Sequence, residues 1–204
     1  MIQLVTASDR PFFERELAEM FRERKKVFVD RLGWEIPVVG GEFEIDQFDT
    51  DEAVYLISTD AHGRQLGSCR LLPTTSPHLL GDVFPHLCEH GAPRGEDVWE
   101  ITRMCTTAAA GPVPKPFRQR ITIAAVEYAL LYGIKRFTLV THAQFLSFIL
   151  STGVDCEPLG LPQQHGDQMI GALAMNITPE TLARLRQLAG QVGPVLRWEV
   201  RDAA

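Results

Sequence analysis

The chain has 204 residues, 45% of them hydrophobic, and a formal net charge of -6 at pH 7. This length and composition suit one domain with a substantial core, and we expect a single domain over residues 1–204. The acidic balance argues against a nucleic-acid partner, because phosphate binding needs a basic face.

The sequence also bears on location and on metals. Residues 1–13 lack the basic and continuous apolar segments of a signal peptide, and no later run has the length needed to span a bilayer. We therefore expect a cytoplasmic protein that does not bind a membrane. His86, Cys88 and His90 could offer metal ligands, but no fourth ligand lies at a recognisable spacing, so we expect no metal site. No zinc or disulfide spacing appears among the cysteines, which are Cys69, Cys88, Cys105 and Cys156.

The N-terminal part predicts a short strand over residues 1–6 and then a helix, with Ser8 or Asp9 as its N-cap and Pro11 in its first turn. One stripe of this helix is apolar apart from a single arginine: Phe13, Leu17, Phe21, Arg24 and Phe28. The stripe aims Arg24 at the interior, although an arginine that snorkels along the core edge is the alternative.

The next part predicts a loop over residues 32–45 that carries Trp34. Two strands joined by a hairpin turn follow, over residues 53–58 and 65–72. Because side chains alternate along a strand, Arg70 projects from the middle of a sheet.

An irregular segment over residues 73–97 is expected to contain one helical turn near Leu79. Residues 98–106 then have the composition of a strand, with Glu100 and Arg103 three positions apart. In a straight strand these two side chains would point to opposite faces, so we predict a β-bulge or a splayed strand there.

The C-terminal half alternates helices and strands. The predicted elements are a helix over 117–132, a strand over 136–141, a helix over 143–152, a strand over 167–177, a helix from Thr178 to Gly190 and a strand over 194–200. Strands first, then helix and strand in alternation, predict an α/β sandwich with a mixed central sheet.

Several charged and aromatic residues stand in otherwise apolar surroundings: Arg24, Phe28, Trp34, Asp46, Asp49, Arg70, Glu100 and Arg103. Arginines bind a carboxylate, carboxylates hold an amine or a sulfonium, and aromatic faces stack on a base or a cation. The set therefore suits a zwitterionic, cationic small molecule. A structural ion-pair network is the alternative, and the run from Glu44 to Asp49 read alone could be a solvated acidic loop.

The order and spacing of these residues resemble the signature motifs of the acyl-homoserine lactone (autoinducer) synthases. The motifs are Arg24-x-x-x-Phe28, Trp34, Glu44-x-Asp46-x-x-Asp49, Ser68-x-Arg70-Leu71-Leu72-Pro73-Thr74 and Trp99-Glu100-x-Thr102-Arg103. The resemblance runs from about residue 15 to about residue 155 and shows no departure at the signature positions.

The resemblance implies a GNAT-like acyltransferase fold, a three-layer α/β sandwich with a mixed central sheet. It also implies a reaction in which the amine of S-adenosylmethionine attacks an acyl thioester, usually held by acyl carrier protein. Lactonisation then expels methylthioadenosine and leaves a quorum-sensing signal. S-adenosylmethionine is a substrate here, and no cofactor is expected.

Site roles follow from the same resemblance. Phe28 and Trp34 should line the S-adenosylmethionine site, Asp46 and Asp49 should organise its charges, and Arg103 should bind substrate. Arg24 and Arg70 should belong to the same polar network, Arg70 among its catalytic members. Glu44 is expected to pair with a neighbouring arginine, and Asp51 and Glu52 to remain solvent charges.

The chemistry adds candidates of its own. An attacking amine must lose its proton, so a base is needed, with Glu100 the first candidate and Asp46 the second. The acyl tail is expected along residues 137–140 and 145–150, with Met104 and Phe84 nearby and Thr141 able to sense a 3-oxo group. Apolar residues such as those at 145–150 are more often simple core, which is the alternative here.

Alternatives remain for the acyl donor and for the class of reaction. The segment after residue 103 lacks the glycine-rich spacing with which many GNAT enzymes bind the pyrophosphate of coenzyme A, which favours a carrier-protein donor. The candidate docking cations are Arg22, Lys25, Lys26, Lys115, Arg118 and Arg120. An acyl-CoA donor, an N-acyltransferase for another amine, and a non-catalytic binding module remain the alternatives.

Overall fold

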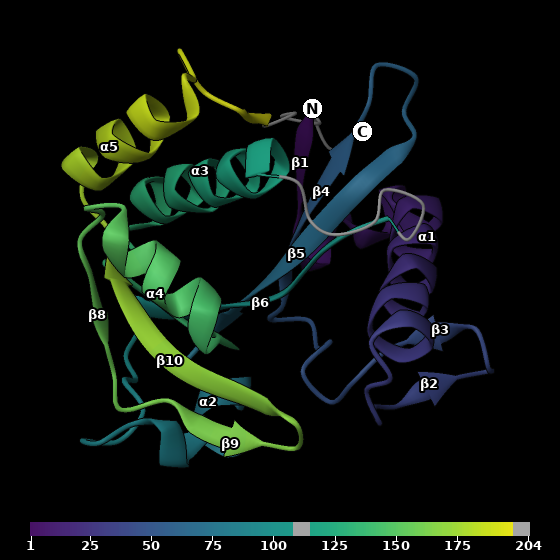
Figure 1. The fold of residues 1–204 in the computed structure, drawn as a ribbon. Coiled ribbons are helices and arrows are strands. Elements are labelled where there is room, and N and C mark those ends of the chain that lie inside the picture. The colour runs from purple at the N-terminus through teal and green to yellow at the C-terminus, as the bar shows by residue number, and fades with distance from the viewer. Residues whose placement is uncertain (108–114, 198–204) are drawn as a thin grey trace. The chain divides into compact units, whose positions relative to one another are not determined.

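The computed structural model describes residues 1–107 and 115–197 (Figure 1). The chain divides into two compact units: unit 1 is Met1–Arg70, Arg103–Ala125 and Val192–Ala204, and unit 2 is Leu71–Thr102 and Val126–Gln191. Three elements run from one unit into the other: β5 (Gln65–Pro73), β6 (Val98–Thr106) and α3 (Lys115–Tyr132). The single domain expected over residues 1–204 stays a prediction.

Unit 1 contains a mixed sheet. Its strand β1 (Ile2–Val5) pairs antiparallel with β4 (Val54–Thr59) and parallel with β11 (Leu196–Arg197). The sheet continues through the N-terminal half of β5 to the end of β6, where the Thr107 amide donates to the Leu66 carbonyl at 3.1 Å. The strands predicted over residues 1–6 and 53–58 are therefore confirmed. Of the last predicted strand, residues 194–200, only Leu196–Arg197 is a strand, and residues 198–200 lie outside the described residues.

The N-terminal helix differs from its prediction. A 3-10 helix η1 (Ala7–Phe12) comes first, with Thr6 as its cap, and α1 (Glu14–Arg24) begins only after Phe13. The carboxylate of Asp9 accepts hydrogen bonds from the amide and hydroxyl of Thr6, so Asp9 completes this cap without being the N-cap itself. Neither Ser8 nor Asp9 caps the α-helix.

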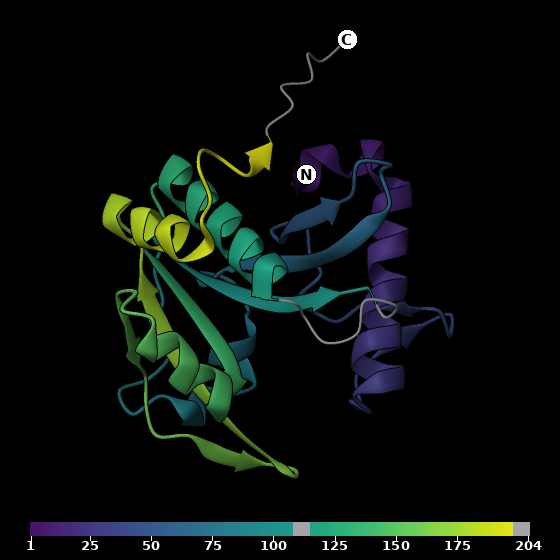
Figure 2. The same ribbon diagram turned by 45° about the horizontal axis from the view of Figure 1, so that its top comes forward.

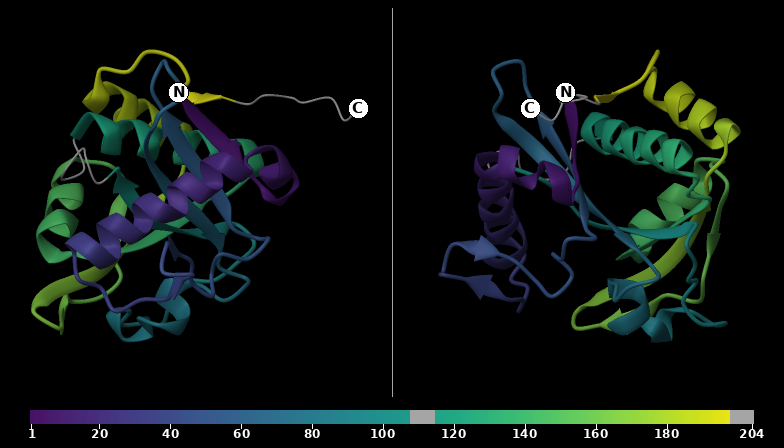
Figure 3. Two further views of the ribbon diagram at one scale, coloured as in Figure 1. Left: turned by 90° about the vertical axis from the view of Figure 1, so that its right-hand side faces the viewer. Right: turned by 180° about the vertical axis from the view of Figure 1, so that it is seen from behind.

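The helix changes its pitch at its C-terminal end. Beyond Arg24 the chain continues as a π-helix, η2 (Lys25–Arg31), and Figure 3 shows α1 and η2 as one uninterrupted coil. π-helical turns are rare and often occur at functional sites. The region predicted as a loop holds a short hairpin, β2 (Val38–Val39) and β3 (Phe43–Glu44), and β3 contacts α1 (Figure 1).

Unit 2 also has a mixed sheet. The N-terminal half of β6 pairs parallel with β7 (Arg136–His142), which pairs antiparallel with β10 (Gln168–Asn176). Two short strands that the sequence did not predict, β8 (Cys156–Pro158) and β9 (Gln163–His165), each pair antiparallel with β10, and Figure 2 shows the β9–β10 hairpin beside α4. The helices of unit 2 are α2 (Leu79–Asp82), η3 (Pro85–Leu87), α4 (Ala143–Ser151), α5 (Pro179–Ala189) and the end of α3.

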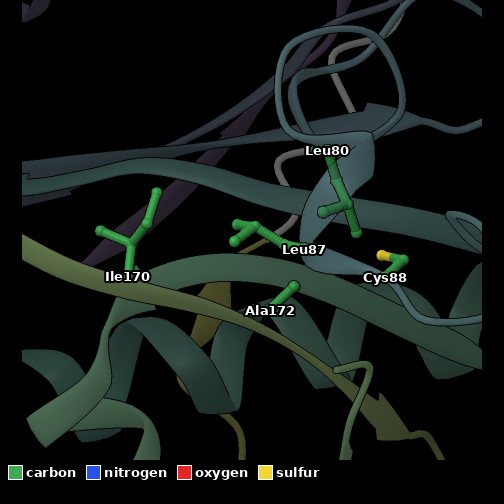
Figure 4. Close-up of a cluster of buried hydrophobic side chains, with 5 residues drawn as sticks. All are labelled: Leu80, Leu87, Cys88, Ile170 and Ala172. Carbon is green, nitrogen blue, oxygen red and sulfur yellow. The ribbon is translucent and has the colours of Figure 1, made fainter. Parts of the chain in front are cut away.

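A hydrophobic cluster joins the irregular segment of unit 2 to β10. Figure 4 shows its buried side chains, which are Leu80, Leu87, Cys88, Ile170 and Ala172. Phe84 and Val140, both predicted beside the acyl tail, pack against this cluster.

The backbone of β6 has an unusual conformation at Arg103, in the stretch where a β-bulge or a splayed strand is predicted, and the bulge itself stays a prediction. This residue has φ 50°, the only positive φ of a non-glycine residue in the described part of the chain. Such a left-handed conformation costs about 1–3 kcal/mol in a non-glycine residue, so the surroundings must hold Arg103 there.

In the described residues, no helix combines the length and apolar character that a membrane crossing requires.

Candidate functional site

The acidic loop of unit 1 is folded by its own side chains. The Phe48 amide donates to Oδ1 of Asp46 at 2.9 Å, and the Asp46 amide donates to Oδ2 of Asp49 at 2.9 Å. Short polar side chains that bond nearby amides favour such turns over helix or strand. As a result, the loop presents two carboxylates side by side instead of spreading them into solvent.

Each of three arginines in unit 1 bridges two carboxylates. Arg24 binds Asp49 through both terminal nitrogens at 2.8 and 2.9 Å and donates from Nε to Glu44 at 2.5 Å. Arg70 binds Asp46 through both terminal nitrogens at 2.6 and 3.1 Å and lies 2.7 Å from Asp49.

Arg103 completes the set. Its Nη2 donates to Oδ2 of Asp46 at 2.7 Å and to Oε1 of Glu44 at 3.1 Å, and its Nε contacts Glu44 at 3.2 and 3.4 Å. The charges thus alternate around a closed ring of six side chains, which we call the ion-pair ring: Arg24, Glu44, Arg103, Asp46, Arg70 and Asp49.

The ion-pair ring is buried and has no formal net charge. The side chains of Arg24 and Glu44 are 1% and 0% exposed, and that of Arg103 is 7% exposed. Removing one partner from a buried pair leaves an uncompensated charge and costs about 3–5 kcal/mol. The ring therefore supplies the structural ion-pair network that the sequence left open, and it confirms that Arg24 points inward and that Glu44 pairs with arginine.

The pKa directions of Asp49, Arg24 and Arg70 favour the charged form of each of these three groups. Burial alone would raise the pKa of Asp49, but hydrogen bonds and attraction from Arg24, with the charge of Arg70, hold it well below its usual range. Burial likewise opposes the charge of Arg24 and of Arg70, yet their carboxylate partners raise the pKa of both guanidinium groups.

Two aromatic rings lie beside the ion-pair ring. Phe28, on the π-helix, stacks on Trp34 with ring centroids 4.8 Å apart, as expected for a loop tryptophan that packs on the core. The guanidinium of Arg103 lies 5.5 Å from the Phe28 ring and 5.9 Å from the Trp34 ring, within cation–π range. Aromatic faces and charges of both signs therefore meet within unit 1.

Tyr55, which the sequence did not single out, donates a hydrogen bond to this site. The Tyr55 hydroxyl donates to Oδ1 of Asp49 at 2.9 Å, and burial together with the Asp49 charge raises the pKa of Tyr55. Arg10 lies over the Tyr55 ring at 5.5 Å and donates to the carbonyls of Thr50 and Ala53. Arg10 also pairs with the carboxylate of Asp51, whose side chain is 91% exposed and so remains a solvent charge, as expected.

Glu100 and Thr141 belong to unit 2. Glu100 is fully buried, and its two oxygens accept hydrogen bonds from the amides of Leu79 and Leu80 at 2.8 and 2.7 Å. It therefore caps the first turn of α2. Thr141 is partly buried on β7, opposite Gly171 of β10. In the part of the chain that the structure describes, no three histidine, cysteine or acidic side chains gather as a metal site would require.

The fold places the chain in a class of proteins. An acyl-CoA N-acyltransferase from Pseudomonas aeruginosa matches 87% of this chain and 99% of its own, with a TM-score of 0.59 at 16% identity, a likeness of fold alone. The chain is thus an α/β protein with a GNAT-like acyltransferase fold and a mixed central sheet, as the sequence predicted.

The sequence comparisons are more specific. The family described as autoinducer synthase matches residues 11–185, and the acyl-homoserine-lactone synthase of Ralstonia solanacearum is 34% identical over 88% of this chain and 92% of its own. The chain therefore belongs to the autoinducer synthase family, whose activity is an acyl transfer that makes acyl-homoserine lactones.

A solved relative describes the ligands of such an enzyme. The CoA-dependent acyl-homoserine lactone synthase BjaI, solved with SAM and isopentyl-CoA, matches 97% of this chain and 92% of its own with a TM-score of 0.87 and 28% identity. The same protein has been solved with MTA.

Proposed function

We propose that this chain transfers an acyl group from acyl carrier protein to the amine of S-adenosylmethionine and then lactonises the product, releasing methylthioadenosine. The observation that carries the proposal is the ion-pair ring beside the Phe28–Trp34 stack. A zwitterionic cation with an adenine base needs charges of both signs and an aromatic face. S-adenosylmethionine is the substrate, and no cofactor takes part.

The residue roles are part of the proposal. Phe28 and Trp34 stack on the ligand, Asp46 and Asp49 hold its positive charges, and Arg103 holds its carboxylate. Arg24 and Arg70 hold Asp49 and Asp46 in place through their ion pairs. The sulfonium already provides the leaving group, so lactonisation requires the carboxylate and the γ-carbon to be brought together.

Glu100 is the proposed base for the first step, with Asp46 second. Both carboxylates already accept hydrogen bonds from protein groups, Glu100 from two amides and Asp46 from two arginines. Because these protein donors already occupy the carboxylate oxygens, a proton that leaves the amine is proposed to reach the base through a bridging water.

The acyl tail is proposed to lie in unit 2 along the cluster drawn in Figure 4. Phe84 and Val140 pack against that cluster, and Phe145 stacks on Phe148 of α4 at 5.9 Å. Thr141 is the proposed contact for an oxygen on the third carbon.

The donor has a second candidate. Three of the cations predicted to dock a carrier protein, Arg22, Lys25 and Lys26, pair with acidic residues of the chain itself. The likeness to a CoA-dependent enzyme favours acyl-CoA as that second candidate.

The test is to incubate the purified chain with S-adenosylmethionine and with acyl carrier protein thioesters or acyl-CoAs from short to long chain. Methylthioadenosine should be released with at least one donor, and the larger kcat/KM identifies the donor class. No release with any donor contradicts the function, and release only with acyl-CoA corrects the donor.

A further inference from the structure

The ion-pair ring constrains how a charged ligand can reach its members. Each guanidinium contacts two carboxylates and each carboxylate contacts two guanidiniums, all with little exposure. A charged ligand that binds these groups must therefore replace an existing ion pair. The question is which of the six pairs gives way.

The pairs at Asp49 are the most strongly held. Asp49 binds Arg24 with both oxygens and also accepts from Tyr55 and from the Asp46 amide. Arg70 is fully buried in the middle of a strand and binds Asp46 with both terminal nitrogens. Bidentate arginine pairs of this kind are the strongest hydrogen-bonded pairs in proteins.

Arg103 is the least firmly held arginine of the ring. Its side chain is the most exposed of the three, and only one of its nitrogens reaches Asp46. Its contacts with Glu44 are 3.1 to 3.4 Å long, against 2.5 Å for Arg24 with Glu44. Its backbone is also in the strained left-handed region.

Arg103 also occupies the place where a ligand would stack. Its guanidinium lies 5.5 Å from the centre of the Phe28 ring and 5.9 Å from that of the Trp34 ring, so a positive group already contacts both of these stacked rings. A ligand cation that takes this position makes the same kind of contact, and it also frees the guanidinium for another partner.

We propose that the Arg103–Asp46 pair opens on binding and that the amino-acid head of S-adenosylmethionine inserts into it, with its carboxylate on Arg103 and its ammonium on Asp46. This inference rests on the proposed function. The insertion exchanges one ion pair for two, so neither charge is left buried and unpaired. The other five pairs of the ring stay closed.

Comparing the binding of S-adenosylmethionine with that of methylthioadenosine distinguishes this insertion from a general effect of a substitution on the site. Methylthioadenosine carries the adenine and the thioether but lacks the amino-acid head. Arg103→Gln and Asp46→Asn should each weaken binding of S-adenosylmethionine by at least about 30-fold, because each leaves one charge of the head unpaired. For both variants, calorimetry should find an affinity for methylthioadenosine within about threefold of the affinity of the unaltered chain.

The matched controls are Arg64→Gln and Asp60→Asn, which break an Arg–Asp pair in the hairpin turn of the same unit, outside the ion-pair ring. They should leave the affinities of both ligands unchanged. Because Asp46 also binds Arg70, Asp46→Asn can lower stability, and Arg103→Gln then carries the test. A crystal structure with S-adenosylmethionine should show Nη2 of Arg103 beyond hydrogen-bonding distance of Asp46 and on the ligand carboxylate.

The outcomes are distinct. Equal losses for both ligands, or a complex in which Arg103 still binds Asp46, overturn the insertion. If the unaltered chain releases methylthioadenosine in the turnover assay while either result is found, the insertion alone fails. If it neither binds S-adenosylmethionine nor turns it over, the proposed function and the insertion both fail.

Discussion

Single residues of unit 1 depend on one another through the ion-pair ring. Each arginine contacts two carboxylates, and each carboxylate contacts two arginines. The ring has six members and no formal net charge, so a single substitution unbalances all of it. Its effect should exceed that of an exposed pair, which is worth about 0–1 kcal/mol.

Tyr55→Phe tests the hydrogen bond that Tyr55 donates to Asp49. The change removes one buried hydrogen bond to a charged group and keeps the ring that packs on Phe21, so it should lower the free energy of unfolding by about 1.5–3 kcal/mol. Urea unfolding measures the change. Tyr128→Phe, at a buried tyrosine of unit 2, is the control, and an equal loss there would show that the hydrogen bond from Tyr55 to Asp49 adds nothing specific.

The sequence predicts most of these residues because arginines and carboxylates are conspicuous in apolar surroundings. Tyr55 is different: a tyrosine in the run AVYLIS fits a buried strand whether or not its hydroxyl has a charged partner. The sequence also could not predict that the six side chains form a closed ring. The ring depends on contacts between residues far apart in the chain, such as Arg103 and Glu44, which are 59 positions apart.

At the scale of elements, spacing predicts helices and strands better than it predicts their variants. Phe28 follows Arg24 by four residues, which fits an α-helix, yet the chain there is a π-helix. Spacing of four cannot distinguish the two, because only the backbone bonding differs. The strands β8 and β9 were missed for another reason: each has only three residues and no alternation.

Thr178→Ala tests the α5 start that the sequence predicted. The Thr178 side chain accepts from the Thr181 amide at 3.2 Å, and Pro179 occupies the first helical position. Losing this cap should cost about 1 kcal/mol. Thermal unfolding should show a lower Tm, whereas Thr178→Ser should keep most of the stability. A Tm unchanged by Thr178→Ala would mean that the cap contributes nothing.

Glu100→Gln separates the two roles of the residue that caps α2. An amide lacks the charge that holds the amides of Leu79 and Leu80, so stability should fall by about 1–3 kcal/mol. If Glu100 is the base, methylthioadenosine release should also fall by about 10²–10⁴-fold in protein that is still folded.

The comparison variant is Glu180→Gln, which replaces an exposed carboxylate in the first turn of α5. It should leave turnover unchanged. Full turnover by folded Glu100→Gln would assign Glu100 to the cap alone and pass the role of base to Asp46 or to water.

At the scale of the whole molecule, the order of elements predicts the fold class, because strands followed by alternating helix and strand leave few arrangements. The division into two units is another matter. Each unit combines separate stretches of the chain, and the boundaries fall inside β5, β6 and α3. A sequence marks boundaries by linkers, and a boundary inside a strand or helix has none.

The stability of the molecule toward acid should depend on Asp49. Its pKa in the folded chain lies well below the ordinary value of 3.8 that applies when the chain is unfolded. The unfolded state therefore binds a proton first as the pH falls, and the stability from Asp49 is present above pH 3.8 and lost progressively below it. Between these two pKa values the loss approaches about 1.4 kcal/mol per pH unit for one proton.

Asp49→Asn should remove this component. The free energy of unfolding, measured by urea at a series of pH values, should be lower for Asp49→Asn at neutral pH, and the two curves should converge as the pH falls below about 4. Asp51→Asn, whose carboxylate is 91% exposed in the unaltered chain, should run parallel to the unaltered chain throughout. Parallel curves for Asp49→Asn as well would mean that Asp49 gains its proton equally readily in both states, and the ion-pair ring would then not hold it ionised.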